Sequence, residues 1–332
     1  MSERKLASIQ RIAEIKNIPN ADSICAYRVN GWLVVDSIGK YQVNDLVIFC
    51  EIDSWIPENI APFLFKGREY NGVKGERLRT IKLRGQVSQG LLLPTHVVMA
   101  NPSSSSIHWN EGGDVTELLG IQKWERPIPT QLQGQMQSNF PSFIHKTDQE
   151  RIQNRLEVLD SHDKWEVSLK MDGSSMTVYW WEGVFGVCSR NIDLKTDQEG
   201  NTFVDVAKRV FDGYDFTGLA IQGELMGPKI QGNRENLEKH QFFVFNIFEI
   251  SRQEYLTPEF TRAFCKENGL THVPVFQEAQ SLNGYTLESM LDLADNTRSL
   301  SHPVAEGLVF KREDGQDSFK VISNKFLLKE KE

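Results

Sequence analysis

A lysine followed by an Asp-Gly pair stands directly after a strand-like run, at Lys170–Gly173. A lysine that leaves a buried strand at such a turn is a candidate nucleophile. Burial and neighbouring cations lower the pKa of its amine, and the free amine can then attack phosphorus. Taken alone, the four residues favour a plainer interpretation, a surface lysine before a type I′ or bulged turn. The chemical interpretation therefore depends on the segments that accompany them.

Four further segments carry residues suited to binding a nucleotide and its phosphates. Gln222–Gly227 ends a strand with the carboxylate of Glu224 beside glycines that permit close approach of a ligand. Phe242–Ile247 is an aromatic strand that could stack on a base. The last two segments are rich in charged and apolar residues: Glu306–Arg312 and Ser318–Ser323. Taken singly, Glu306 fits a solvated turn carboxylate, Phe245 a core aromatic and Lys320 a strand-face lysine.

In chain order, these segments resemble the nucleotidyltransferase motifs of ATP-dependent polynucleotide ligases and mRNA capping enzymes. Lys170–Gly173 resembles the first motif. The other matches follow in the order of the family: Ser189–Asn191 for the short motif that comes next, Gly223–Leu225 for the third, Phe243–Asn246 for its aromatic companion, Glu306–Lys311 for the fourth and Phe319–Val321 for the fifth. The ordered set outweighs the separate explanation of each member.

The sequence outside these motifs is similar to that of one RNA ligase family in particular. Thr80–Leu91, Lys146–Asp148 and Arg151–Asn154 resemble the nick-sealing ligases of the Naegleria and Deinococcus type, which carry an OB domain at the N-terminus. Ser175 stands where DNA ligases and capping enzymes usually carry Arg, and RNA ligases tend to have a small polar residue there. The chain also ends about a dozen residues after Lys320, which leaves no room for the C-terminal OB domain of DNA ligases and capping enzymes.

The resemblance implies an ATP-dependent RNA ligase that joins RNA 3′-OH and 5′-phosphate ends, with nicks in duplex RNA as the expected substrate. Lys170 would form lysyl-AMP, AMP would move to an RNA 5′-phosphate, and an RNA 3′-OH would displace it. Two alternatives stay open. A DNA ligase or mRNA guanylyltransferase is disfavoured by Ser175 and by the missing domain. A catalytically silent RNA-binding protein with an OB domain is disfavoured by the retained Lys170, Glu224, Glu306 and Lys320.

Cations are expected to dominate catalysis, because each transfer builds negative charge on a phosphorus. The resemblance implies that Lys320 and Lys311 contact the α-phosphate and neighbouring oxygens of ATP. It also implies that Arg190 meets the ribose or the RNA end. Arg151 is expected to reach the β- or γ-phosphate.

Carboxylates and apolar side chains complete the implied ATP site. Glu224 belongs to it, and Phe245 and Val309 would enclose the adenine between a π-face and an aliphatic side chain. Three carboxylates are implied to hold Mg²⁺ or Mn²⁺ through water molecules, because both ions favour oxygen ligands: Asp172, Glu224 and Glu306. Such an ion would also lower the pKa of Lys170 and neutralise the α-phosphate.

Strand patterns and resemblance together predict an α+β protein of two domains, which 332 residues can accommodate. Residues 1–100 show short strands with little helix, which predicts a small closed barrel, and the resemblance makes this barrel an OB-fold. Residues 101–139 are expected to form an interdomain linker. Residues 140–332 are expected to form a nucleotidyltransferase domain of the ATP-grasp-like ligase kind, with antiparallel sheets and flanking helices. Within it, the capping-box pattern Thr147–Glu150 predicts a helix that continues to about Leu159.

A basic segment lies in the predicted barrel, with seven cations against only Glu69 and Glu76: Lys66, Arg68, Lys74, Arg77, Arg79, Lys82 and Arg84. OB barrels bind nucleic-acid strands in basic grooves, so an RNA-backbone track that includes Lys82 and Arg84 is one hypothesis. A solvated β-hairpin is the other.

The overall charge of −8 argues against a protein that coats nucleic acid by bulk charge, although it allows a local basic site. No apolar run is long enough to cross a bilayer, and the first residues lack an apolar signal core, so an intracellular protein, cytoplasmic or nuclear, is expected. The four separated cysteines, with no Cys-x-x-Cys pair, are expected to be reduced core thiols. No protein partner can be inferred.

Overall fold

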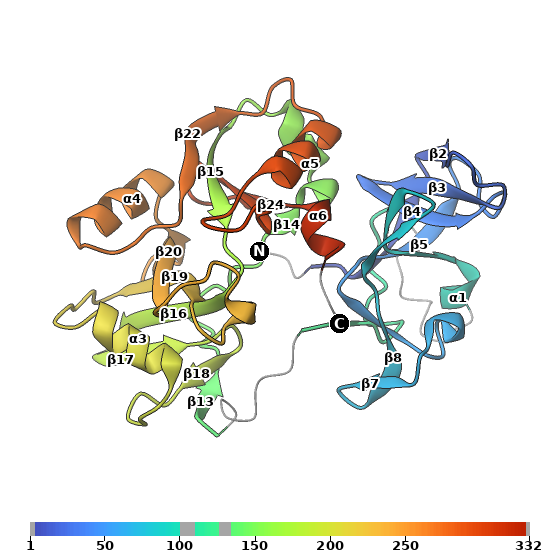
Figure 1. Cartoon of the computed structure of the whole chain (residues 1–332). Helices are drawn as coiled ribbons and strands as arrows, with labels where there is room; N and C mark the ends of the chain where they lie inside the picture. Colours follow the sequence, from blue (N-terminus) through green and yellow to red (C-terminus); the bar gives the residue numbers. More distant parts are fainter. Residues whose placement is uncertain (1–3, 100–109, 126–133, 330–332) are drawn as a thin grey trace. The chain divides into compact units, whose positions relative to one another are not determined.

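The computed structural model describes residues 4–99, 110–125 and 134–329, and the chain divides into two compact units (Figure 1). The first unit comprises residues 1–127 and 327–332, and the second comprises residues 128–326. Both are built mostly from β-sheet with few helices, as the sequence predicted.

The first unit consists of short antiparallel strands joined by tight turns. The strands are β1 Ala7–Arg11, β2 Glu14–Asn17, β3 Ile24–Val29, β4 Trp32–Ser37, β5 Leu46–Cys50, β6 Ser54–Pro57, β7 Arg68–Tyr70, β8 Val73–Arg77, β9 Thr80–Leu83, β10 Gln86–Gln89, β11 Leu91–Pro94 and β12 Gln122–Lys123. Among the described residues of this unit, the short helices are η1 Pro62–Leu64 and α1 His96–Met99. The strands form four small sheets, in the orders β1-β5-β11, β2-β3-β4, β10-β9 and β12-β6-β8-β7.

Residues 110–125 pack into the core of this first unit. Val115, Leu119 and Ile121 are buried in one cluster with Ile48 and Ile56. The segment was expected to be part of the linker, because residues 101–139 contain loop-like stretches rich in Ser, Gly and Gln, with one short helical piece near Val115–Leu119. In the second unit, strand β13 (Met136–Asn139) pairs with strand β18 (Ile192–Leu194). The described parts of residues 101–139 therefore divide between the two units.

The second unit contains two larger sheets. Its strands, besides β13, are β14 Glu150–Arg151, β15 Lys164–Lys170, β16 Ser174–Trp181, β17 Val184–Cys188, β18 Ile192–Leu194, β19 Leu219–Met226, β20 Gln241–Glu249, β21 Glu254–Tyr255, β22 Val275–Ser281, β23 Gly307–Arg312 and β24 Ser318–Ile322. One sheet has the order β13-β18-β17-β16-β19-β20-β21, and the other has the order β14-β24-β23-β15-β22. All pairs are antiparallel except β14 with β24.

Each larger sheet packs against helices. The helices of this part of the chain are α3 Thr202–Val210, α4 Pro258–Glu267, α5 Leu287–Asn296 and α6 Asn324–Leu327, with 3-10 turns η3 Ile152–Asn154, η4 Leu156–Asp160 and η5 Gln231–Asn233. Asn201, Thr257 and Thr286 cap α3, α4 and α5 with side-chain oxygens that accept backbone N–H bonds. The amphipathic helices α3 and α5 bury apolar residues in the two main clusters of the unit.

Strand alternation in β15 separates core residues from site residues. Trp165 and Val167 pack in the cluster that also contains Met290 of α5. Successive side chains of a strand point to opposite faces, so Ser168 and Lys170 lie on the other face. This face contributes to the pocket described below.

The helix predicted from Thr147 to about Leu159 is wrong. The chain instead forms the short strand β14, followed by η3 and η4. The Thr147 hydroxyl donates to Gln222 Oε1 at 3.3 Å, and Glu150 pairs with Phe319 of β24. These tertiary contacts outweigh the local capping signal, as they commonly do for short propensity patterns.

The four cysteines are free and buried, as predicted: Cys25, Cys50, Cys188 and Cys265. Burial raises the pKa of Cys50 to about 12 and that of Cys265 to about 12. Thiols in such surroundings remain protonated and serve as small apolar core residues.

Candidate active site

Lys170, the last residue of β15, lies beside Glu306, which directly precedes β23. The two strands pair with Lys170 opposite Gly307, which places Glu306 next to the lysine. Lys170 Nζ lies 2.7 Å from Glu306 Oε1. Gly307 is needed at this crossing, because a Cβ there would lie 2.2 Å from the carbonyl oxygen of Val321. The strand pairing thus brings the first and fourth predicted motifs together.

Glu224 of β19 approaches the same lysine from the other sheet. The backbone N–H of Gly173 donates to Glu224 Oε1 at 3.0 Å. A Cβ on Gly173 would lie 2.5 Å from the carbonyl oxygen of Leu225, so only glycine permits this approach. Burial raises the pKa of Glu224 to about 8; Lys170 opposes the rise and Glu306 adds to it.

Three carboxylates act on the Lys170 ammonium. Burial lowers the pKa of Lys170, but the charges of Glu306, Glu224 and Asp172 raise it, and the net pKa lies above the ordinary lysine value. Without a bound ligand the pKa of Lys170 is therefore not lowered, and the lowering expected from a bound metal ion stays a prediction. Neighbouring cations were expected to act on this amine, whereas carboxylates surround it.

The same carboxylates fit a divalent cation held through its water shell. Within the described ranges, no group of three or more His, Cys, Asp or Glu side chains could hold a metal ion directly. Burial and the charge of Asp172 raise the pKa of Glu306, while Lys170 lowers it. A buried site with more carboxylates than lysines is suited to a hydrated Mg²⁺ or Mn²⁺.

Asp172 is held by a residue that the sequence did not indicate. Arg234 Nη1 lies 3.2 Å from Asp172 Oδ2. Arg234 Nη2 also donates to the carbonyl oxygen of Val304 at 3.0 Å and lies 3.0 Å from His302 Nδ1. Arg234 thus connects the turn after Lys170 to the segment that leads to β23.

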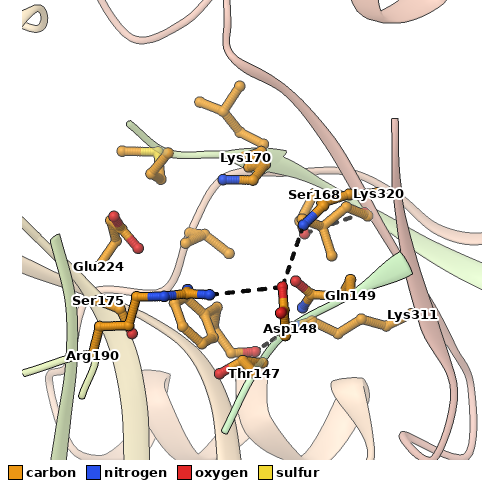
Figure 2. Close-up of a pocket in the computed structure, with 15 residues that line it drawn as sticks. Thr147, Asp148, Gln149, Ser168, Lys170, Ser175, Arg190, Glu224, Lys311 and Lys320 are labelled. Carbon is orange, nitrogen blue, oxygen red and sulfur yellow. Dashed lines mark hydrogen bonds and ion pairs between the residues drawn. The ribbon is translucent and has the colours of Figure 1, made fainter. Parts of the chain in front are cut away.

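A pocket opens beside Lys170, and Figure 2 shows the side chains that surround it. Its lining residues come from both larger sheets and from the loop before β14: Thr147, Asp148, Gln149, Ser168, Leu169, Lys170, Met171, Ser175, Arg190, Glu224, Phe245, Val273, Val309, Lys311 and Lys320. The structure therefore brings most of the predicted ATP-site residues around one pocket. Three predicted residues are not among those that line it: Asp172, Glu306 and Arg151.

Asp148 was missed as a site residue, although it lies between two predicted phosphate-binding cations. Asp148 Oδ1 is 3.6 Å from Lys320 Nζ and 3.7 Å from Arg190 Nη2 (Figure 2). The signal was present in the Lys146–Asp148 match, but the capping-box interpretation assigned these residues to a helix start. In this structure Asp148 holds the two cations on one side of the pocket.

Arg151 is buried at 5% exposure in β14. It pairs in parallel register with Lys320 of β24. Arg151 is not among the residues that line the pocket, so its expected contact with the β- or γ-phosphate stays a prediction.

Lys311 lines the pocket but is almost fully buried, at 5% exposure. Its ammonium donates to the backbone carbonyl oxygen of Phe245. Lys311 lies opposite Glu166 in the β15–β23 register. Burial lowers the pKa of Lys311 to about 8; the Glu166 carboxylate opposes this shift, and Arg262 adds to it.

The basic residues of the first unit fall into two groups. Arg77 pairs with Asp53 at 2.6 Å and lies over the ring of Trp124, and Arg68 pairs with Glu76 at 3.2 Å. Lys82 and Arg84 are exposed on the β9–β10 hairpin, where Arg84 and Gly85 form the turn with positive φ of 48° and 87°.

Two family models match the chain. One described as RNA ligase matches residues 163–322, and one described as an OB-fold domain matches residues 6–95. A search of curated proteins finds no match. Among the described residues, no helix is long and apolar enough to span a membrane.

Solved structures of an RNA ligase from Naegleria gruberi match almost the whole chain. The structure of that enzyme with pyrophosphate is 42% identical, with a TM-score of 0.88 and coverage of 98% of each chain. A mutant with ATP and Mn is 41% identical, with a TM-score of 0.88 and coverage of 98% of this chain and 99% of that one. A mutant with AMP and Mn is 42% identical, with a TM-score of 0.87 and the same coverage.

Proposed function

The chain belongs to the ATP-dependent RNA ligase family, and we propose that it seals breaks with 3′-OH and 5′-phosphate ends, with nicks in duplex RNA as its substrate. Membership shows an RNA ligase enzyme that uses ATP and a divalent metal, with an OB-fold domain before the ligase domain. The geometry around Lys170 supports the finer proposal.

The observation that carries the proposal is the position of Lys170 at the edge of a pocket that also contains Lys320 and Arg190. A nucleophile for phosphorus must stand within reach of cations that stabilise the charge on phosphate oxygens. Glu306 holds the ammonium of Lys170 at 2.7 Å, which orients the amine at the end of β15. This arrangement is suited to an in-line attack on a phosphate placed in the pocket.

In the first step, the Lys170 ammonium gives a proton to solvent, and the free amine attacks the α-phosphorus of ATP. The new N–P bond replaces the bond to the bridging oxygen, pyrophosphate leaves, and the nitrogen gives a second proton to solvent, which yields a lysyl-AMP phosphoramidate. Lys320 is proposed to stabilise the charge on the α-phosphate oxygens, and Arg190 is proposed to contact the ribose or an RNA end.

In the second step, an oxygen of the RNA 5′-phosphate attacks the phosphorus of lysyl-AMP. The Lys170 nitrogen takes a proton from solvent and leaves as the amine, so AMP is joined to the RNA end by a pyrophosphate linkage. In the third step, the RNA 3′-OH attacks the RNA phosphorus of that linkage. The phosphodiester forms and AMP leaves. Both steps develop charge on phosphate oxygens, so Lys320 and Arg190 retain their roles.

Asp172, Glu224 and Glu306 are the residues that would hold the divalent metal through water. When bound, such an ion would supply positive charge that offsets the negative charge of the phosphates. Arg234 orients Asp172 through its contact at 3.2 Å, and the Gly173 N–H orients Glu224 at 3.0 Å. These contacts hold two of the three carboxylates in place before the ligand arrives.

Phe245 and Val309 form the proposed adenine site. Both line the pocket, Phe245 from β20 in one sheet and Val309 from β23 in the other. An aromatic face on one side and an aliphatic side chain on the other suit a purine base.

Lys82 and Arg84 are the proposed RNA contacts of the OB domain. Both are exposed, and neither forms an ion pair with any described residue. Exposed cations at the tip of a hairpin can neutralise backbone phosphates without losing an existing partner. Arg68 and Arg77 are proposed to stabilise the fold, because each already pairs with a carboxylate.

Ligation of defined RNA substrates tests this function. The full chain is incubated with ATP, Mn²⁺ and a labelled RNA strand that carries a 5′-phosphate, either at a nick in duplex RNA or as a single strand with a free 3′-OH partner. We expect sealing of the nick far faster than joining of single strands. A nick with a 5′-OH is the matched control and should remain open. Equal rates on nicked and single-stranded RNA would contradict the substrate proposal.

A further inference from the structure

Strand β20 contains a β-bulge at Phe245. Gln222 of β19 pairs with Asn246, and the next residue, Gly223, pairs with Val244, so within the described sheet Phe245 has no partner on β19. A bulge inserts one extra residue, bends the strand and redirects a side chain. Gly223 accommodates the bend, because a Cβ there would lie 2.4 Å from the carbonyl oxygen of Phe243.

The backbone carbonyl of Phe245 accepts a hydrogen bond from a residue of the other large sheet. The Lys311 ammonium donates to the carbonyl oxygen of Phe245. This bond connects β23 to β20, which belong to different sheets. A buried backbone carbonyl displaced from its ladder is costly without a donor, and a charged donor forms a stronger bond than a neutral one.

The charge of Lys311 is partly offset inside the protein by a carboxylate on the neighbouring strand. Glu166 lies opposite Lys311 in the β15–β23 register and is exposed by only 1%. Arg262 of α4 also pairs with Glu166. A lysine held by a carbonyl and faced by a carboxylate is fixed in place more firmly than one that reaches into solvent.

We infer that Lys311 is a positioning residue for the adenine site: it holds the Phe245 bulge in the form that presents the aromatic ring to the pocket, and it does not contact the phosphates. The inference rests on the proposed function in that Phe245 is taken as the platform for adenine. It replaces the role expected for Lys311 from the sequence, contact with the α-phosphate. Lys320 keeps that role.

Separate probes for base and phosphate test the inference. Adenosine has no phosphate and pyrophosphate has no base, so their binding to the full chain with Mn²⁺ present reports the two halves of the site independently. We expect Lys311→Met to weaken adenosine binding about tenfold and to leave pyrophosphate binding unchanged. Lys320→Met is the matched control, with the opposite pattern. Loss of pyrophosphate binding in Lys311→Met with adenosine binding intact would overturn the inference.

A double-mutant cycle shows whether Lys311 acts through Phe245. Phe245→Leu should weaken adenosine binding by itself, and adding Lys311→Met should then produce no further loss. Additive losses would contradict action through the bulge.

If Lys311→Met does not fold because Glu166 is left with excess charge, the double variant Glu166→Gln/Lys311→Met removes that charge and is tested on the same two probes. A wild-type protein that binds neither probe would contradict the proposed function itself, which separates the two failures.

Discussion

Lys170 Nζ and Glu306 Oε1 lie 2.7 Å apart, although the two residues come from motifs at opposite ends of the ligase domain. The contact follows from the pairing of β15 with β23, in which Lys170 is opposite Gly307. Glu224 approaches the same lysine from the other sheet. The site is thus assembled where strand ends of two sheets face one another.

Glu306→Gln should weaken the metal dependence of Lys170 adenylylation. The substitution keeps the size of the side chain but removes one of the charges proposed to hold the ion through water. We expect the Mn²⁺ concentration for half-maximal adenylylation to rise about tenfold to a hundredfold. The measurement is a metal titration of AMP-adduct formation. Glu313→Gln, an exposed carboxylate after β23, is the control. A titration identical to that of the wild type would exclude Glu306 as a metal-holding residue.

Asp148→Asn should increase the affinity for pyrophosphate. Asp148 lies 3.6 Å from Lys320 and 3.7 Å from Arg190, so its carboxylate competes with a ligand phosphate for these cations. Removal of the charge should tighten pyrophosphate binding by about threefold, measured by calorimetry. The same substitution in a Lys320→Met background should have a smaller effect. Weaker binding in the single variant would mean that Asp148 assists the ligand.

Lys82→Ala combined with Arg84→Ala should slow nick sealing without slowing Lys170 adenylylation. The two cations are proposed to contact only the RNA backbone, and each lost phosphate contact should reduce the slope of log affinity against log salt by about one. RNA binding at several salt concentrations measures this slope. Lys40→Ala removes a cation of the same unit that pairs with Asp36 at 2.7 Å, and it serves as the control. An unchanged slope in the double variant would place the RNA track elsewhere.

Lys311 should make the free energy of unfolding depend on pH. Burial lowers its pKa to about 8 from the ordinary lysine value of 10.5, so between these values the unfolded chain binds a proton that the folded chain has lost. The cost of burying the charge is fully present below pH 8 and is relieved as pH rises toward 10.5. Relative to Lys311→Met, the wild type should therefore gain stability over this window, by at most about 1.4 kcal/mol per pH unit. Denaturant unfolding of both proteins across the window checks this, and a constant difference would contradict it.

Much of the ligase domain could be predicted because its strands carry local signals. β15 alternates apolar residues such as Trp165 with polar residues such as Ser168, so its strand character and the position of Lys170 at its end follow from the sequence. The helices α4 and α5 begin after Thr257 and Thr286 as their caps indicate. The family resemblance then supplied the order of the motifs.

Features that depend on contacts between the sheets could not be predicted. The role inferred for Lys311 depends on a bulge in β20, whose register is set by pairing with β19 and leaves no mark in the sequence around Lys311. Asp148 belongs to a capping pattern that predicted a helix start, but tertiary contacts of this segment favour a different structure, in which Asp148 lies beside Lys320. The pKa of Lys170 depends on the adjacent Asp172 and on two carboxylates from distant segments, and only folding shows that their charges outweigh burial.

The intact mass of the full chain after incubation with ATP and Mn²⁺, with Lys170→Ala measured alongside, tests the central claim most directly. The account predicts that the wild type gains the mass of one AMP and that Lys170→Ala gains none. An unchanged mass in folded, metal-supplied wild type would contradict covalent nucleotidyl transfer by this chain. An equal gain in both proteins would place the nucleophile at another residue.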